Sequence, residues 1–186
     1  KLISKKQAIL RIDPSSLDSL LHPTLDEKSE IKVIANGLPA SPGAASGKVV
    51  FTSEEAERLN NMMQETILVR VETSPEDIQG MHAAKGILTA RGGMTSHAAV
   101  VARGMGRPCV SGSSEIDINY ERKIFKTSNL EIKEGDIITI DGSTGRIILG
   151  EVQTVKPEIS GDFQKLMSWA DNIRKLRVRA NSETPF

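Results

Sequence analysis

The run RGGMTSHAAVVARGMG, residues 91–106, carries the clearest structural and chemical pattern of the chain. Two glycines are followed by Thr95 and Ser96, which are residue types that favour the N-cap of a helix. Apolar residues then recur at helical spacing, which is typical of a helix with one buried face. The expected core-facing residues are Ala98, Val101, Ala102 and Met105. The run therefore predicts a tight turn that leads into an amphipathic helix from about residue 96 to residue 105.

Short apolar and β-branched runs on both sides of this helix predict further strands. Strands are expected at residues 48–51, 66–71, 86–90, 108–110, 123–126 and 136–140, and a hairpin strand at 146–149. Helix starts are expected at Thr52, through a capping box with Glu55, and at Ser74-Pro75. The alternation predicts an α/β core at residues 31–155, flanked by helical arms at residues 1–30 and 156–186.

His97 lies in the first turn of the helix predicted from residue 96. The first N–H groups of a helix have no intrahelical acceptor and carry partial positive charge, so they form an anion site. The same charge favours a neutral, nucleophilic ring, and the hydroxyls of Thr95 and Ser96 can contact phosphate oxygens. No carboxylate lies close to His97 in the sequence. His97 is therefore a candidate phosphoryl acceptor, and the alternative is a histidine that only begins a core helix.

The composition argues against several classes of function. The 24 Lys and Arg residues are balanced by 24 Asp and Glu residues, and aromatic residues make up 3% of the chain. This argues against nucleic-acid and anionic-membrane binding. No apolar run approaches the ~20 residues that span a bilayer. Cys109 is the only cysteine, which excludes an internal disulfide and fits a reducing cytoplasm. Because the chain begins without Met, we expect it to be a piece of a longer protein.

Other candidate sites carry weaker patterns. Residues 43–48 are similar to a phosphate-binding loop, but the run is one residue short and Val49 stands where Ser or Thr is required. Cys109 has no partner at zinc-ligand spacing and is expected to be a small buried hydrophobic residue. His22 and His82 are expected to be structural.

The run at 92–103 resembles the phosphohistidine signature of enzymes that use phosphoenolpyruvate. This class includes pyruvate phosphate dikinase, phosphoenolpyruvate synthase and enzyme I of the sugar phosphotransferase system. Met94 and residues 103–106 are most similar to the dikinases, because the sister families more often have Arg at the position of Met94. Further segments that resemble dikinases are residues 10–14, 37–47 and 177–185. A synthase or enzyme I domain, and a non-catalytic docking module on the same fold, remain as alternatives.

The resemblance implies a swivelling β/β/α domain that carries a phosphoryl group between two catalytic domains. In dikinases an ATP-grasp domain converts ATP and phosphate to AMP and pyrophosphate, and a barrel domain converts pyruvate to phosphoenolpyruvate. His97 then corresponds to the tele-phosphohistidine, and Thr95 to a regulatory phosphorylation site. The residues expected to stabilise the phosphate are Gly93, Thr95, Ser96 and Arg91.

The resemblance also carries expectations about cofactor, location and assembly. Mg²⁺ is expected in the neighbouring domains and no metal in this chain. The full-length enzyme is expected to be a cytoplasmic homodimer. The 186-residue chain alone is expected not to complete turnover, because both substrate sites lie in the other domains.

Overall fold

The computed structural model describes residues 2–13, 17, 21–26, 30–155 and 161–176. The chain forms two compact units, one of residues 21–157 and one of residues 1–20 together with 158–186. The segment 177–185, which resembles the dikinases in sequence, lies outside the described residues.

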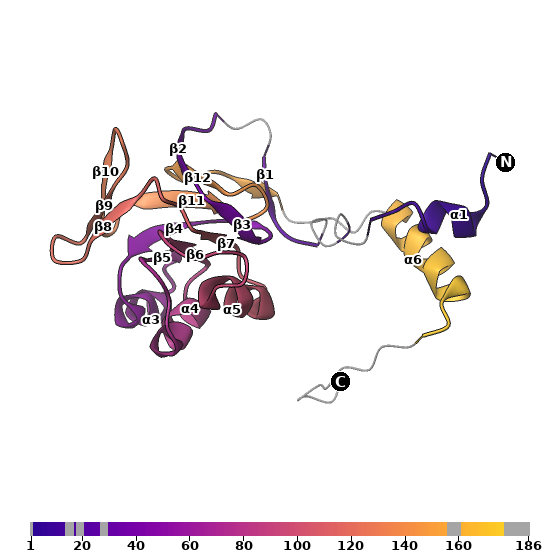
Figure 1. Cartoon of the computed structure of the whole chain (residues 1–186), viewed down its shortest axis with the longest axis horizontal. Helices are drawn as coiled ribbons and strands as arrows, with labels where there is room; N and C mark the ends of the chain where they lie inside the picture. The colour runs from indigo at the N-terminus through magenta and orange to yellow at the C-terminus, as the bar shows by residue number, and fades with distance from the viewer. Residues whose placement is uncertain (1, 14–16, 18–20, 27–29, 156–160, 177–186) are drawn as a thin grey trace. The chain divides into compact units, whose positions relative to one another are not determined.

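An eight-stranded mixed sheet forms the centre of the unit 21–157 (Figure 1). Its strand order is β2 (Val33–Asn36), β12 (Arg146–Leu149), β11 (Ile137–Asp141), β4 (Ala44–Val50), β5 (Thr66–Arg70), β6 (Gly86–Thr89), β7 (Cys109–Ser111) and β3 (Leu38–Ser41). Strands β4 to β7 run parallel and the other pairs are antiparallel. The two edge strands, β2 and β3, are joined directly at Gly37, whose N–H donates to the carbonyl of Gly145 at 2.8 Å. The sheet therefore curls until its two edges approach each other.

Alternate residues of the parallel strands face two different hydrophobic clusters. In β5, Ile67 and Val69 belong to one cluster and Leu68 to the other. In β6, Leu88 and Ile87 divide in the same way. The division follows from the two-residue period of a strand. Because both faces are covered, these strands are continuously apolar, and the predicted buried strands at 66–71 and 86–90 are confirmed.

Three helices cover one face of the parallel strands (Figure 1). They are α3 (Ser53–Asn61), α4 (Ile78–Ala83), which a 3₁₀ turn at Pro75–Asp77 precedes, and α5 (His97–Met105). In α5, Ala98, Ala99 and Ala102 are buried against the strands. The helix predicted from residue 96 is thus confirmed, although Val101 and Met105 are only partly buried.

The start of α3 differs in detail from the sequence prediction. The Thr52 hydroxyl accepts a hydrogen bond from the Glu55 N–H at 3.2 Å, as an N-cap does. The reciprocal half of the predicted capping box is not formed. Glu55 instead makes an ion pair with Arg58 at 2.6 Å, because the guanidinium one turn later offers a charged partner. The prediction of an N-cap was right, and that of a complete box was wrong.

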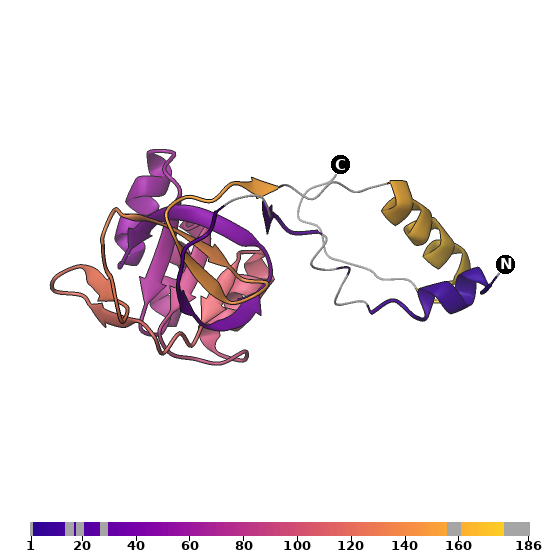
Figure 2. The ribbon, with the colours of Figure 1, turned by 90° about the horizontal axis from the view of Figure 1, so that it is seen from above.

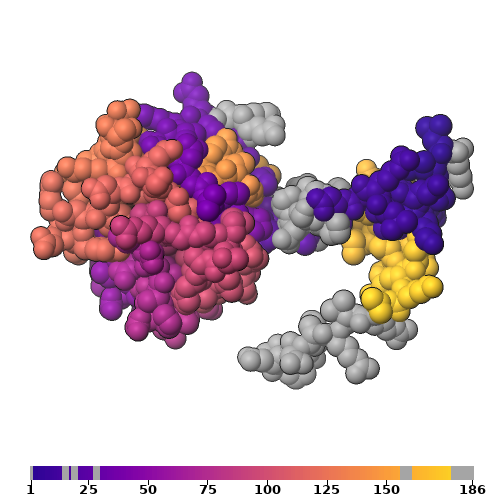
Figure 3. Space-filling view, viewed as in Figure 1, coloured from indigo at the N-terminus to yellow at the C-terminus, as the bar shows by residue number. Residues whose placement is uncertain are grey.

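The face opposite the helices is covered by antiparallel strands and by a second sheet. This small sheet consists of β8 (Asp117–Asn119), β9 (Ile124–Lys126) and β10 (Glu131–Lys133), in the order β10-β9-β8. Phe125 and Ile132 bury its inner side against Ile138 and Ile140 of β11. The small sheet projects from one side of the unit (Figures 1 and 2) and forms a continuous part of its surface (Figure 3). The layering is mixed α/β, as the sequence predicted.

The remaining elements lie near the ends of the chain. In the unit 21–157, β1 (Thr24–Leu25) pairs antiparallel with β13 (Thr154–Val155). In the other unit, α1 (Lys5–Ile9) lies beside α6 (Gly161–Ile173) (Figures 1 and 2). Neither helix contains a buried residue. Across the described part of the chain, each helix is too short or too polar to cross a bilayer.

Candidate functional site

His97 is the first residue of α5, and its ring is half-buried. Its Nδ1 atom lies 3.0 Å from the Oγ1 atom of Thr73, within hydrogen-bond distance. The other ring nitrogen, Nε2, has no hydrogen-bond partner within the ranges that the structure describes. The ring is therefore held through one nitrogen and offers the other. This arrangement differs from that of a histidine that only begins a core helix.

The topology of the sheet brings Thr73 to His97. Residues 71–77 follow β5, and residues 90–96 follow its parallel neighbour β6. The two segments are joined by a hydrogen bond from the Arg91 N–H to the Val71 carbonyl at 2.9 Å. The role of Thr73 was not predicted from the sequence. The carboxyl ends of adjacent parallel strands meet at one edge of a sheet, so the pattern of strands could have indicated the contact.

The turn before α5 has the predicted form. Gly92 has a φ of +108°, a conformation that favours glycine. Ser96 is the N-cap, and its hydroxyl accepts a hydrogen bond from the Ala99 N–H at 3.3 Å. The N–H groups of His97 and Ala98 make no hydrogen bond within the described part of the chain. Two amides beside the imidazole are thus free for an anion.

The other residues predicted to stabilise a phosphate lie close to His97 in the chain. Gly93 is half-buried, and a Cβ atom added there would meet no atom within 4 Å. Thr95 is exposed, and the Ser96 hydroxyl already accepts the cap hydrogen bond. Arg91 is exposed, and its side chain makes no hydrogen bond or ion pair with the described residues. The backbone of the turn holds these residues close together, whereas no described residue orients the Arg91 side chain.

A carboxylate that is distant in the sequence lies near His97. Glu76 belongs to the same loop as Thr73 and accepts a short hydrogen bond from the Ser74 hydroxyl. This hydrogen bond is the main cause that holds the pKa of the Glu76 carboxyl below its usual value, and the charge of His97 makes a smaller contribution. Glu76 is therefore within electrostatic range of the imidazole, which its distance in the sequence did not indicate.

The weaker candidate sites have structural roles. Residues 44–48 of the loop-like run lie in strand β4, so the rejection of a phosphate-binding loop is confirmed. Cys109 is fully buried in β7, as predicted, and burial raises the pKa of its thiol to about 12. The carbonyl of His82 accepts a hydrogen bond from Arg107 at 2.9 Å. Among the residues that the structure describes, no three His, Cys, Asp or Glu side chains gather to hold a metal ion.

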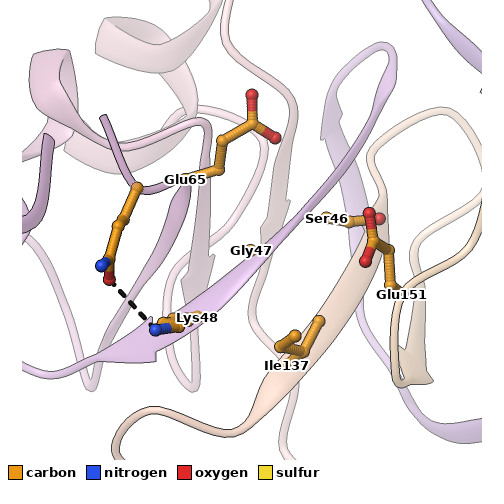
Figure 4. A pocket seen from close by; sticks show the side chains of 7 residues that line it. Ser46, Gly47, Lys48, Glu65, Ile137 and Glu151 are labelled. Atoms are coloured by element: carbon orange, nitrogen blue, oxygen red, sulfur yellow. Dashed lines mark hydrogen bonds between the residues drawn. The ribbon is translucent and has the colours of Figure 1, made fainter. Parts of the chain in front are cut away.

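Two hollows in the surface of the unit 21–157 are lined by residues other than His97. One has a volume of about 230 Å³ and is lined by residues of β4 with Gln64, Glu65 and Glu151 (Figure 4). The other, of about 520 Å³, extends past Lys85 and Pro108. Glu65, Lys85 and Pro108 directly precede β5, β6 and β7, respectively, so both hollows lie at the amino edge of the parallel strands. His97, by contrast, follows the carboxyl edge. A surface site at a helix start suits a group that must be passed between other proteins or domains.

The chain is similar to known proteins of one class. Residues 62–145 match the family described as "PEP-utilising enzyme, mobile domain". Residues 62–145 therefore carry the mobile domain of this family. Over nearly its full length the chain is similar to pyruvate, phosphate dikinases.

Three of these relatives show the extent of the similarity. The chain is 58% identical over 184 residues to the dikinase of Rhizobium meliloti (strain 1021), 55% over 186 residues to that of Clostridium symbiosum, and 54% over 186 residues to "Pyruvate, phosphate dikinase 1, chloroplastic" of Arabidopsis thaliana. Each alignment covers 99% of this chain and 20%, 21% and 19% of the relative, respectively. The chain thus spans about a fifth of the length of these relatives, and it corresponds to their mobile domain.

Proposed function

We propose that the chain is the phosphoryl carrier of a pyruvate, phosphate dikinase and that His97 accepts the phosphoryl group on Nε2. The observation that carries the proposal is the hydrogen bond between Thr73 and Nδ1, which leaves Nε2 open beside two free backbone amides. A neutral imidazole has one protonated nitrogen. We infer the tautomer in which Nδ1 carries the proton and donates it to the Thr73 oxygen, so that the lone pair lies on Nε2.

The transfer then follows from this tautomer. The Nε2 lone pair attacks the phosphorus atom, the bond from phosphorus to the leaving oxygen breaks, and that oxygen departs with the electron pair. The ring becomes cationic and retains its Nδ1 proton, which Thr73 continues to accept. In the second transfer, an acceptor oxygen attacks the phosphorus atom and the electrons of the N–P bond return to the ring.

The turn before α5 supplies groups for the phosphate oxygens. The free N–H groups of His97 and Ala98 point from a helix start, where an anion gains ~0.3–1 kcal/mol. The Thr95 and Ser96 hydroxyls add donors, and the open space at Gly93 admits another molecule. Arg91, with its exposed side chain, adds positive charge during the transfer.

The rest of the proposed enzyme lies in other domains. An ATP-grasp domain loads His97 from ATP and phosphate, with AMP and pyrophosphate as products, and a barrel domain unloads it onto pyruvate. Mg²⁺ is held with the substrates in those domains. Residues 1–30 and 156–186 connect the carrier, residues 31–155, to its neighbours and allow it to swivel. We infer a cytoplasmic homodimer for the full-length enzyme.

Phosphorylation from phosphoenolpyruvate tests this proposal. The chain is mixed with a dikinase barrel domain, Mg²⁺ and phosphoenolpyruvate, and intact mass and phosphopeptides are measured. One acid-labile phosphoryl group is expected on His97 and none on the variant His97→Gln. His82→Gln is the matched control, because His82 also belongs to a helix, is exposed and should not affect labelling. A folded chain that gains no phosphoryl group, or a His97→Gln variant that is still labelled, would contradict the proposal.

A further inference from the structure

Val71 joins the two loops that form the His97 site. Strand β5 ends at Arg70, so the next N–H group has no strand partner. The Val71 N–H donates to the hydroxyl oxygen of Tyr120 at 2.8 Å, and the Val71 carbonyl accepts from the Arg91 N–H at 2.9 Å. Arg91 begins the turn that leads to His97. Val71 therefore links the small sheet, the Thr73 loop and the His97 turn.

The ring of Tyr120 is held independently of its hydroxyl. It packs edge-on against Phe51, with ring centroids 6.4 Å apart and an interplanar angle of 87°. The Arg70 guanidinium lies over the Tyr120 ring, 5.3 Å from its centroid. Tyr120 is 41% exposed, so it contributes little to the core. These contacts fix the hydroxyl oxygen at the point where β5 ends.

The far end of the Thr73 loop is fixed at Asp77. This carboxylate is 4% exposed and accepts hydrogen bonds from the Ser53 hydroxyl at 2.9 Å and the Ser74 N–H at 3.0 Å. It also makes an ion pair with Arg70 at 3.3 Å. Thr73 thus lies between two anchors, Tyr120 at the start of the loop and Asp77 at its end.

We propose that Tyr120 is a positioning residue for His97. By holding the Val71 amide, it places the Thr73 oxygen so that the Nδ1 tautomer is retained and Nε2 remains the outward, reacting nitrogen. The inference rests on the proposed carrier function. It gives the small sheet a role in the chemistry, although none of its residues reaches the imidazole itself within the described contacts.

The variant Tyr120→Phe tests this role because it removes only the oxygen and retains the ring. The ¹⁵N-labelled 186-residue chain is measured by two-bond ¹H–¹⁵N NMR, which distinguishes the two tautomers of His97. The unsubstituted chain is expected to show the Nδ1–H tautomer, and Tyr120→Phe a mixture with the Nε2–H form. Thr73→Val is expected to produce the same mixture, since it removes the acceptor directly.

The same samples are then phosphorylated with phosphoramidate, in which ammonia is the leaving group. The rate at Nε2 of Tyr120→Phe is expected to fall by about three- to thirtyfold, because misplacing a reacting group by 1 Å can cost ~100-fold. The matched control is Thr127→Val, which removes another hydroxyl that accepts a backbone N–H, that of Leu130, at the turn of the small sheet. This control should leave both the tautomer and the rate unchanged.

Tyr120 is the only tyrosine of the chain, which provides a second measurement should Tyr120→Phe unfold. Global labelling with 3-fluorotyrosine then places a single fluorine atom beside this hydroxyl, and its ¹⁹F signal is expected to shift when His97 is phosphorylated. An unchanged tautomer in folded Tyr120→Phe, or an unmoved ¹⁹F signal, would overturn the inference. Neither result would affect the carrier function, which is tested separately by labelling of the unsubstituted chain and of His97→Gln from phosphoenolpyruvate.

Discussion

At the scale of single residues, the proposed carrier function places two requirements on His97. The ring must be oriented, yet one nitrogen must stay open to a reactant of another domain. Thr73 meets the first requirement through Nδ1, and the half-exposed position of His97 at a helix start meets the second. An ordinary core histidine would be held through both nitrogens or through packing.

Thr95 provides a test of charge at the same turn. The variant Thr95→Glu is expected to lower the rate of His97 phosphorylation by at least about tenfold, since ~1.4 kcal/mol of repulsion between the carboxylate and the incoming phosphoryl donor is enough for that factor. Thr95→Gln has a similar size without the charge and serves as the control. Rates are measured by quenched mass spectrometry. Equal rates for the two variants would remove the proposed regulation through Thr95.

At the scale of elements, tight backbone contacts join the two sides of the curled sheet. The turn between β11 and β12 meets the strands of the opposite edge at Gly142, where an added Cβ atom would lie 1.9 Å from the Ser41 carbonyl oxygen and 2.9 Å from the Cys109 nitrogen. Neither backbone group can move without separating β3 from β7. The closure of the sheet thus requires a residue without a Cβ atom at position 142.

Gly142→Ala is therefore expected to destabilise the fold by about 2–4 kcal/mol, the range of substitutions that strain a packed backbone. Gly104→Ala is the control, because an added Cβ in α5 would meet no atom within 4 Å. That variant is expected to gain about 0.5–1 kcal/mol from helix propensity. Urea unfolding of both variants measures the difference. A Gly142→Ala variant as stable as the unsubstituted chain would show that the edges of the sheet can separate without cost.

Elements with a strong local pattern were predictable from the sequence, and those fixed by distant partners were not. The apolar run at 66–71 predicted strand β5, and the helical spacing of apolar residues at 96–105 predicted helix α5. The bounds of both elements lie within one residue of the prediction. Strand β3 was missed, because Pro39 disfavours a central strand and only the edge position beside β7 permits it. The Thr73 contact was not predicted because it requires β5 and β6 to be parallel neighbours, which the order of the strands along the chain indicates but does not fix.

At the scale of the whole molecule, one buried thiol couples the stability of the core unit to pH. Burial raises the pKa of Cys109 to about 12, whereas in the unfolded chain it titrates near 8.5. Between these values the unfolded state releases the proton and the folded state keeps it, so the unfolded state binds fewer protons. By linkage, the free energy of unfolding then falls as the pH rises. Below about pH 8.5 the thiol is protonated in both states and the contribution is constant.

The free energy of unfolding is expected to fall by about 1.4 kcal/mol per pH unit above pH 9 through this group alone. Other ionisable groups of the chain also contribute at high pH, so the quantity to measure is the difference between the unsubstituted chain and Cys109→Ala. That variant loses the packing of the sulfur at every pH but lacks the thiol titration, so the two stability curves should converge from pH 8.5 to pH 10.5 by about 2–3 kcal/mol. Curves that stay parallel would mean that the thiolate is tolerated inside the sheet. Water would then reach the interface between β7 and α5, the helix that begins at His97.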